Sequence, residues 1–202
     1  MLSDPVSARR YAEGKNRLKQ YLLRPQQTLN YDINKVYKIP VVFHIVGPDP
    51  TLITNAMVQY QVAVLNRDYA GINGDSANAA GFYNKRGHIK FVFELAKRSP
   101  EGCDTNGITR TVSGSVFTSA GIGQIKYNST GGHDAWDSYN CKYLNIWVGF
   151  ASGGLLGKAT FPFTNVPPQE QGVFTGFNTF MNNPALGAFT YGRTLVHEVG
   201  HK

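Results

Sequence analysis

The sequence predicts an α/β protein in which a mixed, mostly parallel twisted sheet packs against helices. Residues 39–46 form a continuous run of β-branched and aromatic residues, which is typical of a strand buried on both faces. After this run, apolar residues between Asn55 and Tyr69 recur with helical spacing. Strand-like segments then follow, and the chain finishes in a short helical pattern. Strands that alternate with helices in this way indicate a layered α/β architecture.

Composition limits the domain number and the partners. With 202 residues, of which 42% are hydrophobic, the chain can bury one substantial core, so we expect one main domain. No apolar run is long enough to cross a bilayer, and charged residues interrupt the first residues, so no signal peptide is visible. The net charge of +7 comes largely from the first quarter, without basic residues interleaved with stacking aromatics. We therefore expect no nucleic-acid and no membrane partner.

We predict that the first 35 residues form a leader that precedes the globular domain. Ser3 or Asp4 can cap a helix with Pro5 in its first turn, and Arg24 followed by Pro25 ends it. Residues 26–35 are polar and aperiodic, which is typical of a linker. We therefore divide the chain into a leader, residues 1–35, and a domain, residues 36–202.

Within the domain, a helix capped by Thr54 or Asn55 follows the first strand and ends near Gly71. Its predicted buried stripe consists of Met57, Val58, Val62, Leu65, Asn66 and Tyr69. Residues 89–95 alternate between apolar and polar and predict a half-buried strand. Further strand-like segments lie at residues 107–112, 143–148, 155–161 and 172–177. Residues 113–132 are rich in Ser, Thr and Gly and show no clear period.

The most informative motif is H-E-x-x-H, formed by His197, Glu198 and His201. On a helix, histidines four residues apart project from one face, where their ring nitrogens can bind one Zn²⁺. Leu195, Val196 and Val199 supply the apolar positions such a helix needs to pack on a sheet. The alternative is the end of an amphipathic helix with two solvated histidines.

A catalytic zinc site normally has three protein ligands and a water molecule, and the motif supplies only two. The chain ends one residue after His201, so we expect the third ligand to be absent from it. His44 lies in an apolar strand and is expected to be a core histidine, whereas His88 is expected to face solvent. His133 lies in a loop and is a poor substitute, because a loop position gives no reason for tetrahedral geometry.

Several segments together resemble the pappalysin, or cytophagalysin, metallopeptidases, a branch of the metzincins. They are IPVVFHIV at 39–46, YLNIWV at 143–148, LGKATFP at 156–162 and GRTLVHEVGH at 192–201. The resemblance implies the upper catalytic subdomain of a metzincin, with a backing helix and an active-site helix. In that family the motif continues to a glycine and a third histidine, and a methionine turn follows. None of these is present, and Gln171 replaces a usual aspartate.

The resemblance implies a secreted zinc-dependent metalloendopeptidase that acts on proteins or peptides. His197 and His201 would bind Zn²⁺, and Glu198 would serve as general base. Residues 155–159 resemble the edge strand that pairs with substrate, although an ordinary edge strand is an equal alternative. Residues 1–35 would be a propeptide-like leader. Two other interpretations stay open: a catalytically incompetent fragment or pseudoenzyme that binds metal or peptide weakly, and a different clan with a distant glutamate as third ligand.

The two cysteines, Cys103 and Cys141, are too few for a zinc ribbon. In a secreted protein they can form a disulfide, and in a reducing compartment they stay thiols. Both alternatives are open. The leader contains no cysteine that could act as a cysteine-switch inhibitor.

Overall fold

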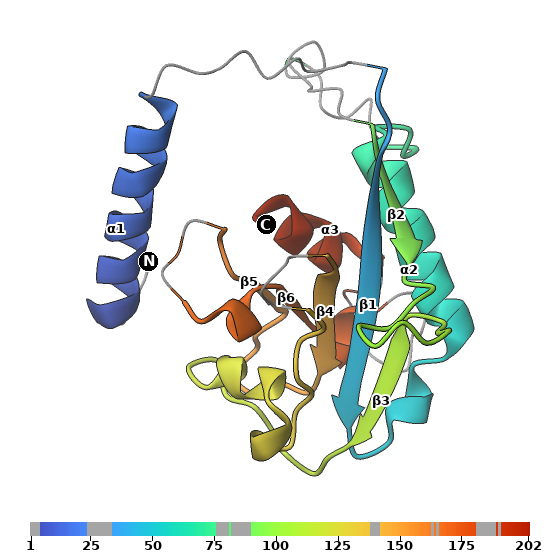
Figure 1. The fold of residues 1–202 in the computed structure, drawn as a ribbon. Coiled ribbons are helices and arrows are strands. Elements are labelled where there is room, and N and C mark those ends of the chain that lie inside the picture. Colours follow the sequence, from blue (N-terminus) through green and yellow to red (C-terminus); the bar gives the residue numbers. More distant parts are fainter. Residues whose placement is uncertain are drawn as a thin grey trace.

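The computed structural model describes most of the chain: residues 5–23, 34–75, 81, 90–137, 142–162, 164, 166–180, 189 and 191–202. These residues form one six-stranded sheet with helices and turns on both of its faces (Figure 1). None of the described helices is long and apolar enough to cross a membrane. The predicted fold class, a mixed and mostly parallel sheet with packed helices, is confirmed.

The sheet is built around β1, Tyr37–Gly47. Along one edge of β1, the first half pairs with β2, Phe91–Leu95, and the second half with β3, Ile108–Val112. The other edge pairs with β4, Leu144–Gly149, which in turn pairs with β6, Val173–Gly176. All of these pairings are parallel. The last strand, β5, Gly157–Ala159, is antiparallel to β6 and forms the edge of the sheet.

The continuous apolar run of β1 is explained by its central position. Residues 41–47 are all buried, because both faces of the strand are covered. Val41, Phe43 and Ile45 point to the face that carries the helices, and Val46 points to the other face. Two separate clusters therefore make up the core.

The first face is covered by α2, Asn55–Tyr69, and by α3, Arg193–Gly200. The hydroxyl of Thr54 accepts a hydrogen bond of 3.2 Å from the Met57 amide, so the predicted cap is confirmed. Of the predicted stripe, Val58 and Leu65 are buried, whereas Met57, Val62, Asn66 and Tyr69 are half-buried. Gln61 and Val64 are buried as well. The prediction missed them because α2 is covered by the sheet on one side and by α3 on another, which a single amphipathic stripe does not reveal.

The second face is covered by residues 113–137, which include the stretch without a clear period, residues 113–132. It contains two short 3₁₀-helices, η3, Ile122–Lys126, and η4, Asn128–Thr130. Apolar residues from this stretch pack on apolar residues of β1, β4 and β6. Together they form the second cluster, which consists of Phe117, Ile122 and Ile125 from the stretch and Val46, Trp147 and Phe174 from the strands. Irregular backbone thus does here what helices do on the first face.

The leader helix α1, Pro5–Leu22, stands apart from the sheet on the side of β5 (Figure 1). Its predicted extent is confirmed, and the predicted linker lies mainly outside the described residues. Its described ring contact with the domain joins Tyr11 to Phe161, whose centroids are 5.8 Å apart. Tyr11 is half-buried, and Gly14, one turn further along, is buried.

Candidate metal and catalytic site

The two histidines of the motif lie together on the exposed side of α3. The Nε2 atoms of His197 and His201 are 3.0 Å apart, and the rings are nearly perpendicular, at 89°. Both residues are exposed. The predicted convergence of the two imidazoles on one point is therefore present in the structure.

The apolar side of α3 determines which way the polar residues face. Leu195 is 1% exposed and Val199 is 8% exposed, and both belong to the core cluster of the first face. Because these residues are buried against the sheet, His197 and His201 are turned away from it.

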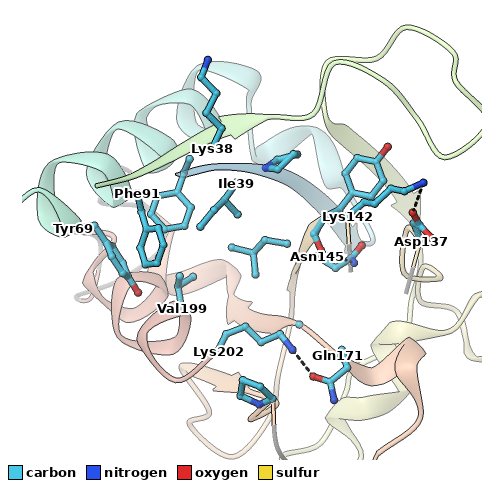
Figure 2. Close-up of a pocket in the computed structure, with 16 residues that line it drawn as sticks. Lys38, Ile39, Tyr69, Phe91, Asp137, Lys142, Asn145, Gln171, Val199 and Lys202 are labelled. Atoms are coloured by element: carbon cyan, nitrogen blue, oxygen red, sulfur yellow. Dashed lines mark hydrogen bonds and ion pairs between the residues drawn. The ribbon is translucent and has the colours of Figure 1, made fainter. Parts of the chain in front are cut away.

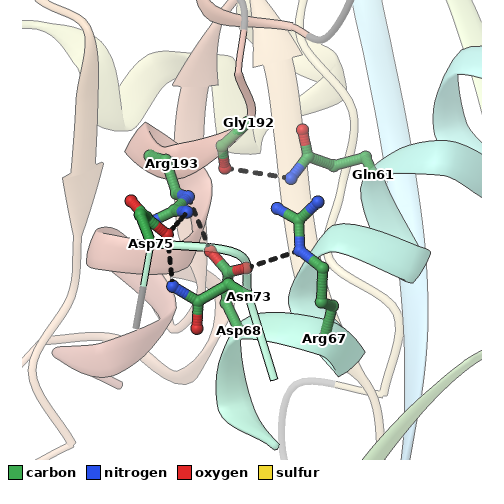
Figure 3. Close-up of polar contacts among 7 residues, drawn as sticks. All are labelled: Gln61, Arg67, Asp68, Asn73, Asp75, Gly192 and Arg193. Atoms are coloured by element: carbon green, nitrogen blue, oxygen red, sulfur yellow. Dashed lines mark hydrogen bonds and ion pairs between the residues drawn. The ribbon is translucent and has the colours of Figure 1, made fainter. Parts of the chain in front are cut away.

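Polar contacts hold the start of the same helix (Figure 3). The buried amide of Gln61 donates a 3.1 Å hydrogen bond to the carbonyl of Gly192, which has a left-handed φ of 71°. Arg193 forms ion pairs of 2.8 Å with Asp68 and 2.7 Å with Asp75. Its hydrogen bond lowers the pKa of Asp75 to about 2. These contacts substitute for a side-chain cap, which α3 lacks.

Glu198 lies against the edge strand β5. A Cβ atom at Gly157 would be only 2.6 Å from Cγ of Glu198 and 3.0 Å from Cγ2 of Thr194, so glycine is what permits this approach. Burial raises the pKa of Glu198, while the charges of His197 and His201 and a hydrogen bond from the Ala159 backbone lower it. The carboxyl group thus sits between the two histidines and the sheet edge.

An aromatic contact borders the second histidine. The ring of Phe161 is 5.2 Å from the ring of His201, at an angle of 68°. Phe161 also contacts Tyr11 of the leader helix. One side chain therefore connects the leader to a candidate metal ligand.

His44 has a structural role, as predicted. It is fully buried, and Oδ1 of Asn145 lies 3.0 Å from its Nε2 and accepts a 2.8 Å hydrogen bond from the Trp136 amide. Nε2 of His44 must then donate, so Nδ1 accepts from the Thr109 hydroxyl at 2.9 Å. Burial, followed by the charge of nearby His133, lowers the pKa of His44 to about 3, so the ring is neutral.

The donor set fits part of a zinc site. Two Nε2 atoms at 3.0 Å suit two neighbouring ligands of one tetrahedral ion, each about 2.0–2.1 Å from it. Among the described residues no group of three metal-binding side chains occurs. His133 stacks on His44 at 4.4 Å and takes no part in such a group. His88 and Cys141 lie outside the described residues, and Cys103 is exposed and has a free thiol.

A cavity of about 580 Å³ opens beside the side of α3 that carries Val199, where β1, β4 and β6 begin (Figure 2). Val199 and Lys202 line it, but His197, Glu198 and His201 do not. Gln171, the position at which the sequence departs from the family pattern, accepts a hydrogen bond from Lys202 in this cavity. The hydroxyl of Tyr69 is buried there and has no hydrogen-bond partner among the described residues.

Sequence reasoning identified the motif residues but missed their neighbours. The sequence places Arg193 in a segment that resembles the family, and Gly157 and Phe161 in a strand-like stretch. It assigns none of the three a contact with the motif. Their contacts with α3 join residues far apart in the sequence. The available signal was weak: a glycine beside a predicted edge strand indicates that something approaches the backbone closely.

Comparison with known proteins gave structural matches. No family model and no curated protein matches the chain. Mirolysin in complex with compound 9 is 38% identical, with a TM-score of 0.75; the match covers 83% of this chain and 63% of that one. Mature mirolysin of Tannerella forsythia in complex with a cleaved peptide is 37% identical, with a TM-score of 0.74 and the same coverage. A promirolysin mutant of Tannerella forsythia is 32% identical, with a TM-score of 0.80; that match covers 99% of this chain and 64% of that one. The chain thus spans less than two thirds of each.

We predict that Gly157→Ala destabilises the protein by about 1–3 kcal/mol, because the added methyl group collides with Glu198. Urea denaturation measures this. The control is Gly114→Ala, which meets no atom within 4 Å and, like Gly157, lies at a backbone conformation open to alanine. Glu198→Ala should restore part of the stability in the double variant. Equal stability of Gly157→Ala and Gly114→Ala would contradict the close approach.

Proposed function

Because the chain belongs to the pappalysin-type metallopeptidase family, of which mirolysin is a member, we propose that it carries the zinc-binding helix and general base of a peptidase. The observation that carries the proposal is the pair of Nε2 atoms 3.0 Å apart, with Glu198 between them in sequence and packed against the edge strand. His197 and His201 would bind the metal ion.

A bound zinc ion would supply a water molecule of lowered pKa and would polarise the substrate carbonyl. The residues of this chain prepare that chemistry. His197 and His201 present their Nε2 atoms from one helix face. Glu198 would accept a proton on its carboxylate and later deliver it to the leaving nitrogen. Gly157 lets the carboxylate stay close to β5, and the Ala159 backbone helps to hold it there.

The substrate would be a protein or peptide held in an extended conformation. β5 is the terminal strand of the sheet, and β6 is its partner in the described structure. An extended peptide can add to such an edge through backbone hydrogen bonds, with few demands on its side chains. The mature mirolysin structure contains a cleaved peptide, which supports this substrate class.

The alternative is a catalytically incompetent protein that binds metal or peptide weakly. Among the described residues no third metal-binding side chain joins His197 and His201, which leaves this alternative open. Recruitment of a distant glutamate is a further possibility for the third ligand. Metal binding and turnover separate these alternatives, as set out below.

We further propose that residues 1–35 form a leader that covers the site. The match to mature mirolysin covers 83% of the chain, and the match to promirolysin covers 99%. Residues 36–202 are 167 of the 202 residues, or 83% of the chain. This agreement and the contact of Tyr11 with Phe161 support a leader that rests beside the metal-binding helix. Secretion of the protein stays a prediction, which detection in the culture medium would test.

The first prediction concerns metal affinity. We expect this chain to bind Zn²⁺ weakly and to lose it to buffer chelators, because the described residues provide two ligands where a catalytic site has three. Titration against a competing zinc indicator measures this, with His201→Ala as the disrupted variant and His133→Ala as the matched control. Tight, stoichiometric binding that depends on His201 would reveal a third protein ligand.

The second prediction concerns Glu198. In a chimera that continues after Lys202 with the remaining part of mirolysin, we expect Glu198→Ala to lower casein hydrolysis about a hundredfold to ten-thousandfold. Zinc should stay bound, because Glu198 is not a ligand. Glu94→Ala, which removes a carboxylate from the solvent side of β2, is the matched control. Full activity of the Glu198→Ala chimera would remove Glu198 from the mechanism, and an inactive parent chimera would favour the incompetent alternative.

The third prediction concerns the leader. Removal of residues 1–35 from the same chimera should raise its rate of peptide hydrolysis, because α1 no longer rests on Phe161 beside His201. Tyr11→Ala in the complete leader should have a smaller effect in the same direction, and Arg17→Ala, at an exposed position of α1, should have none. Equal turnover with and without the leader would show that it does not cover the site.

A further inference from the structure

Lys126, the last residue of η3, is a buried lysine that the proposed mechanism does not use. Its side chain is inserted beside the second core cluster, and the residue is only 5% exposed. Its Nζ donates a 2.9 Å hydrogen bond to the hydroxyl of Thr160 and a second one to the carbonyl of Glu170. The same group lies 5.1 Å from the ring centre of Trp147.

These partners mark the two ends of the connection between β5 and β6, of which the structure describes residues 160–162, 164 and 166–170; we call these described residues the strap. Thr160 directly follows β5, and Glu170 ends the 3₁₀-helix η5, Pro168–Glu170, just before β6. The hydroxyl of Thr160 also donates a 2.7 Å hydrogen bond to the Glu170 carbonyl. Lys126 Nζ therefore lies where the strap closes on itself. Phe161, which contacts His201, is the second residue of the strap.

Among the described residues, no acidic side chain forms an ion pair with Lys126. Glu170 is the acidic residue whose charge acts on it, but Oε1 of Glu170 accepts a hydrogen bond from Tyr127. Lys158 on β5 and Lys202 after α3 act on it with the same sign of charge. Burial is the main cause that lowers the pKa of Lys126 to about 7, and Lys158 and Lys202 add to the effect.

A buried amine in this position costs stability that an apolar side chain would not. Methionine, for example, would fill a similar volume in the cluster without a charge. What an apolar residue cannot provide is a donor to both ends of the strap. The retained lysine thus indicates a role in holding the strap.

We propose that Lys126 is a positioning residue, which ties both ends of the strap to the sheet and so holds β5 beside Glu198 and Phe161 beside His201. Its importance for peptide hydrolysis rests on the proposed function. Its role in closing the strap does not, because the contacts involve neither the metal nor the substrate.

The pH dependence of this role has a definite sign. Lys126 has a pKa of about 7 with the strap closed and its ordinary pKa of about 10.4 when solvated. Below pH 7 the amine is protonated in both states, and closure carries the full cost of the buried charge. As the pH rises above 7, the closed state loses the proton first, so closure becomes more favourable. A neutral amine still donates to both Thr160 and Glu170.

Hydrogen exchange of the 202-residue chain tests the proposal, after correction for intrinsic exchange rates. The wild type is compared with Lys126→Met and with the control Lys97→Met, which alters an exposed lysine. Near pH 6, where the buried charge opposes closure, the amides of residues 157–161 should be protected no more in the wild type and the control than in Lys126→Met. Above pH 7, we compare the ratio of amide protection in the wild type or the control to amide protection in Lys126→Met. This ratio should rise by up to about tenfold for each pH unit. A ratio of one, or any ratio that does not change from about pH 6 to about pH 9, overturns the proposal.

Trp147 provides a second measurement, which also serves if Lys126→Met folds poorly. In a Trp136→Phe background, Trp147 is the one remaining tryptophan. Its fluorescence should change with a midpoint near pH 7 as the neighbouring amine titrates, and Lys126→Met should abolish the change. A flat wild-type profile overturns the proposal. Because neither measurement needs turnover, an inactive chimera would refute the proposed peptidase and leave the role of Lys126 intact.

Discussion

The packing of α3 on the sheet is the constraint on which the rest of the site depends. Leu195 and Val199 are buried in the core shared with α2 and the strands. Since both lie on one side of the helix, the histidines must point the other way. The ion pairs of Arg193 add a second anchor at the start of the helix.

The edge of the sheet completes what the helix begins. β5 contributes no charged group to Glu198, yet its backbone approaches the carboxylate so closely that a methyl group at Gly157 would collide with it. The same strand offers its backbone at the outer edge of the sheet. A single three-residue strand thus sets the place of Glu198, the proposed general base, and provides the outer edge on which an extended peptide would pair under the proposed function.

The second face of the sheet carries buried polar side chains. His44, Asn145 and Lys126 lie there, each with hydrogen-bond partners drawn from distant segments. Such groups stabilise a fold only when their partners are all in place. This explains why residues 113–137, whose regular structure is limited to two short 3₁₀-helices, still follow a defined path across the sheet, which reaches the strap beside α3.

The sequence by itself determined the helices and strands that show a regular hydrophobic pattern, and it determined the spacing of the H-E-x-x-H motif. The apolar run of β1, the Thr54 cap of α2 and the spacing of His197 and His201 are local properties, and the structure contains each of them. Only the tertiary structure decided that Gln61 is buried under α3, that Gly157 touches Glu198, and that Lys126 joins the ends of the strap. The physical reason is that these contacts join residues that lie 34 to 131 positions apart in the sequence. Periodicity and propensity report only on the chain within a few turns, whereas such contacts depend on how the layers pack.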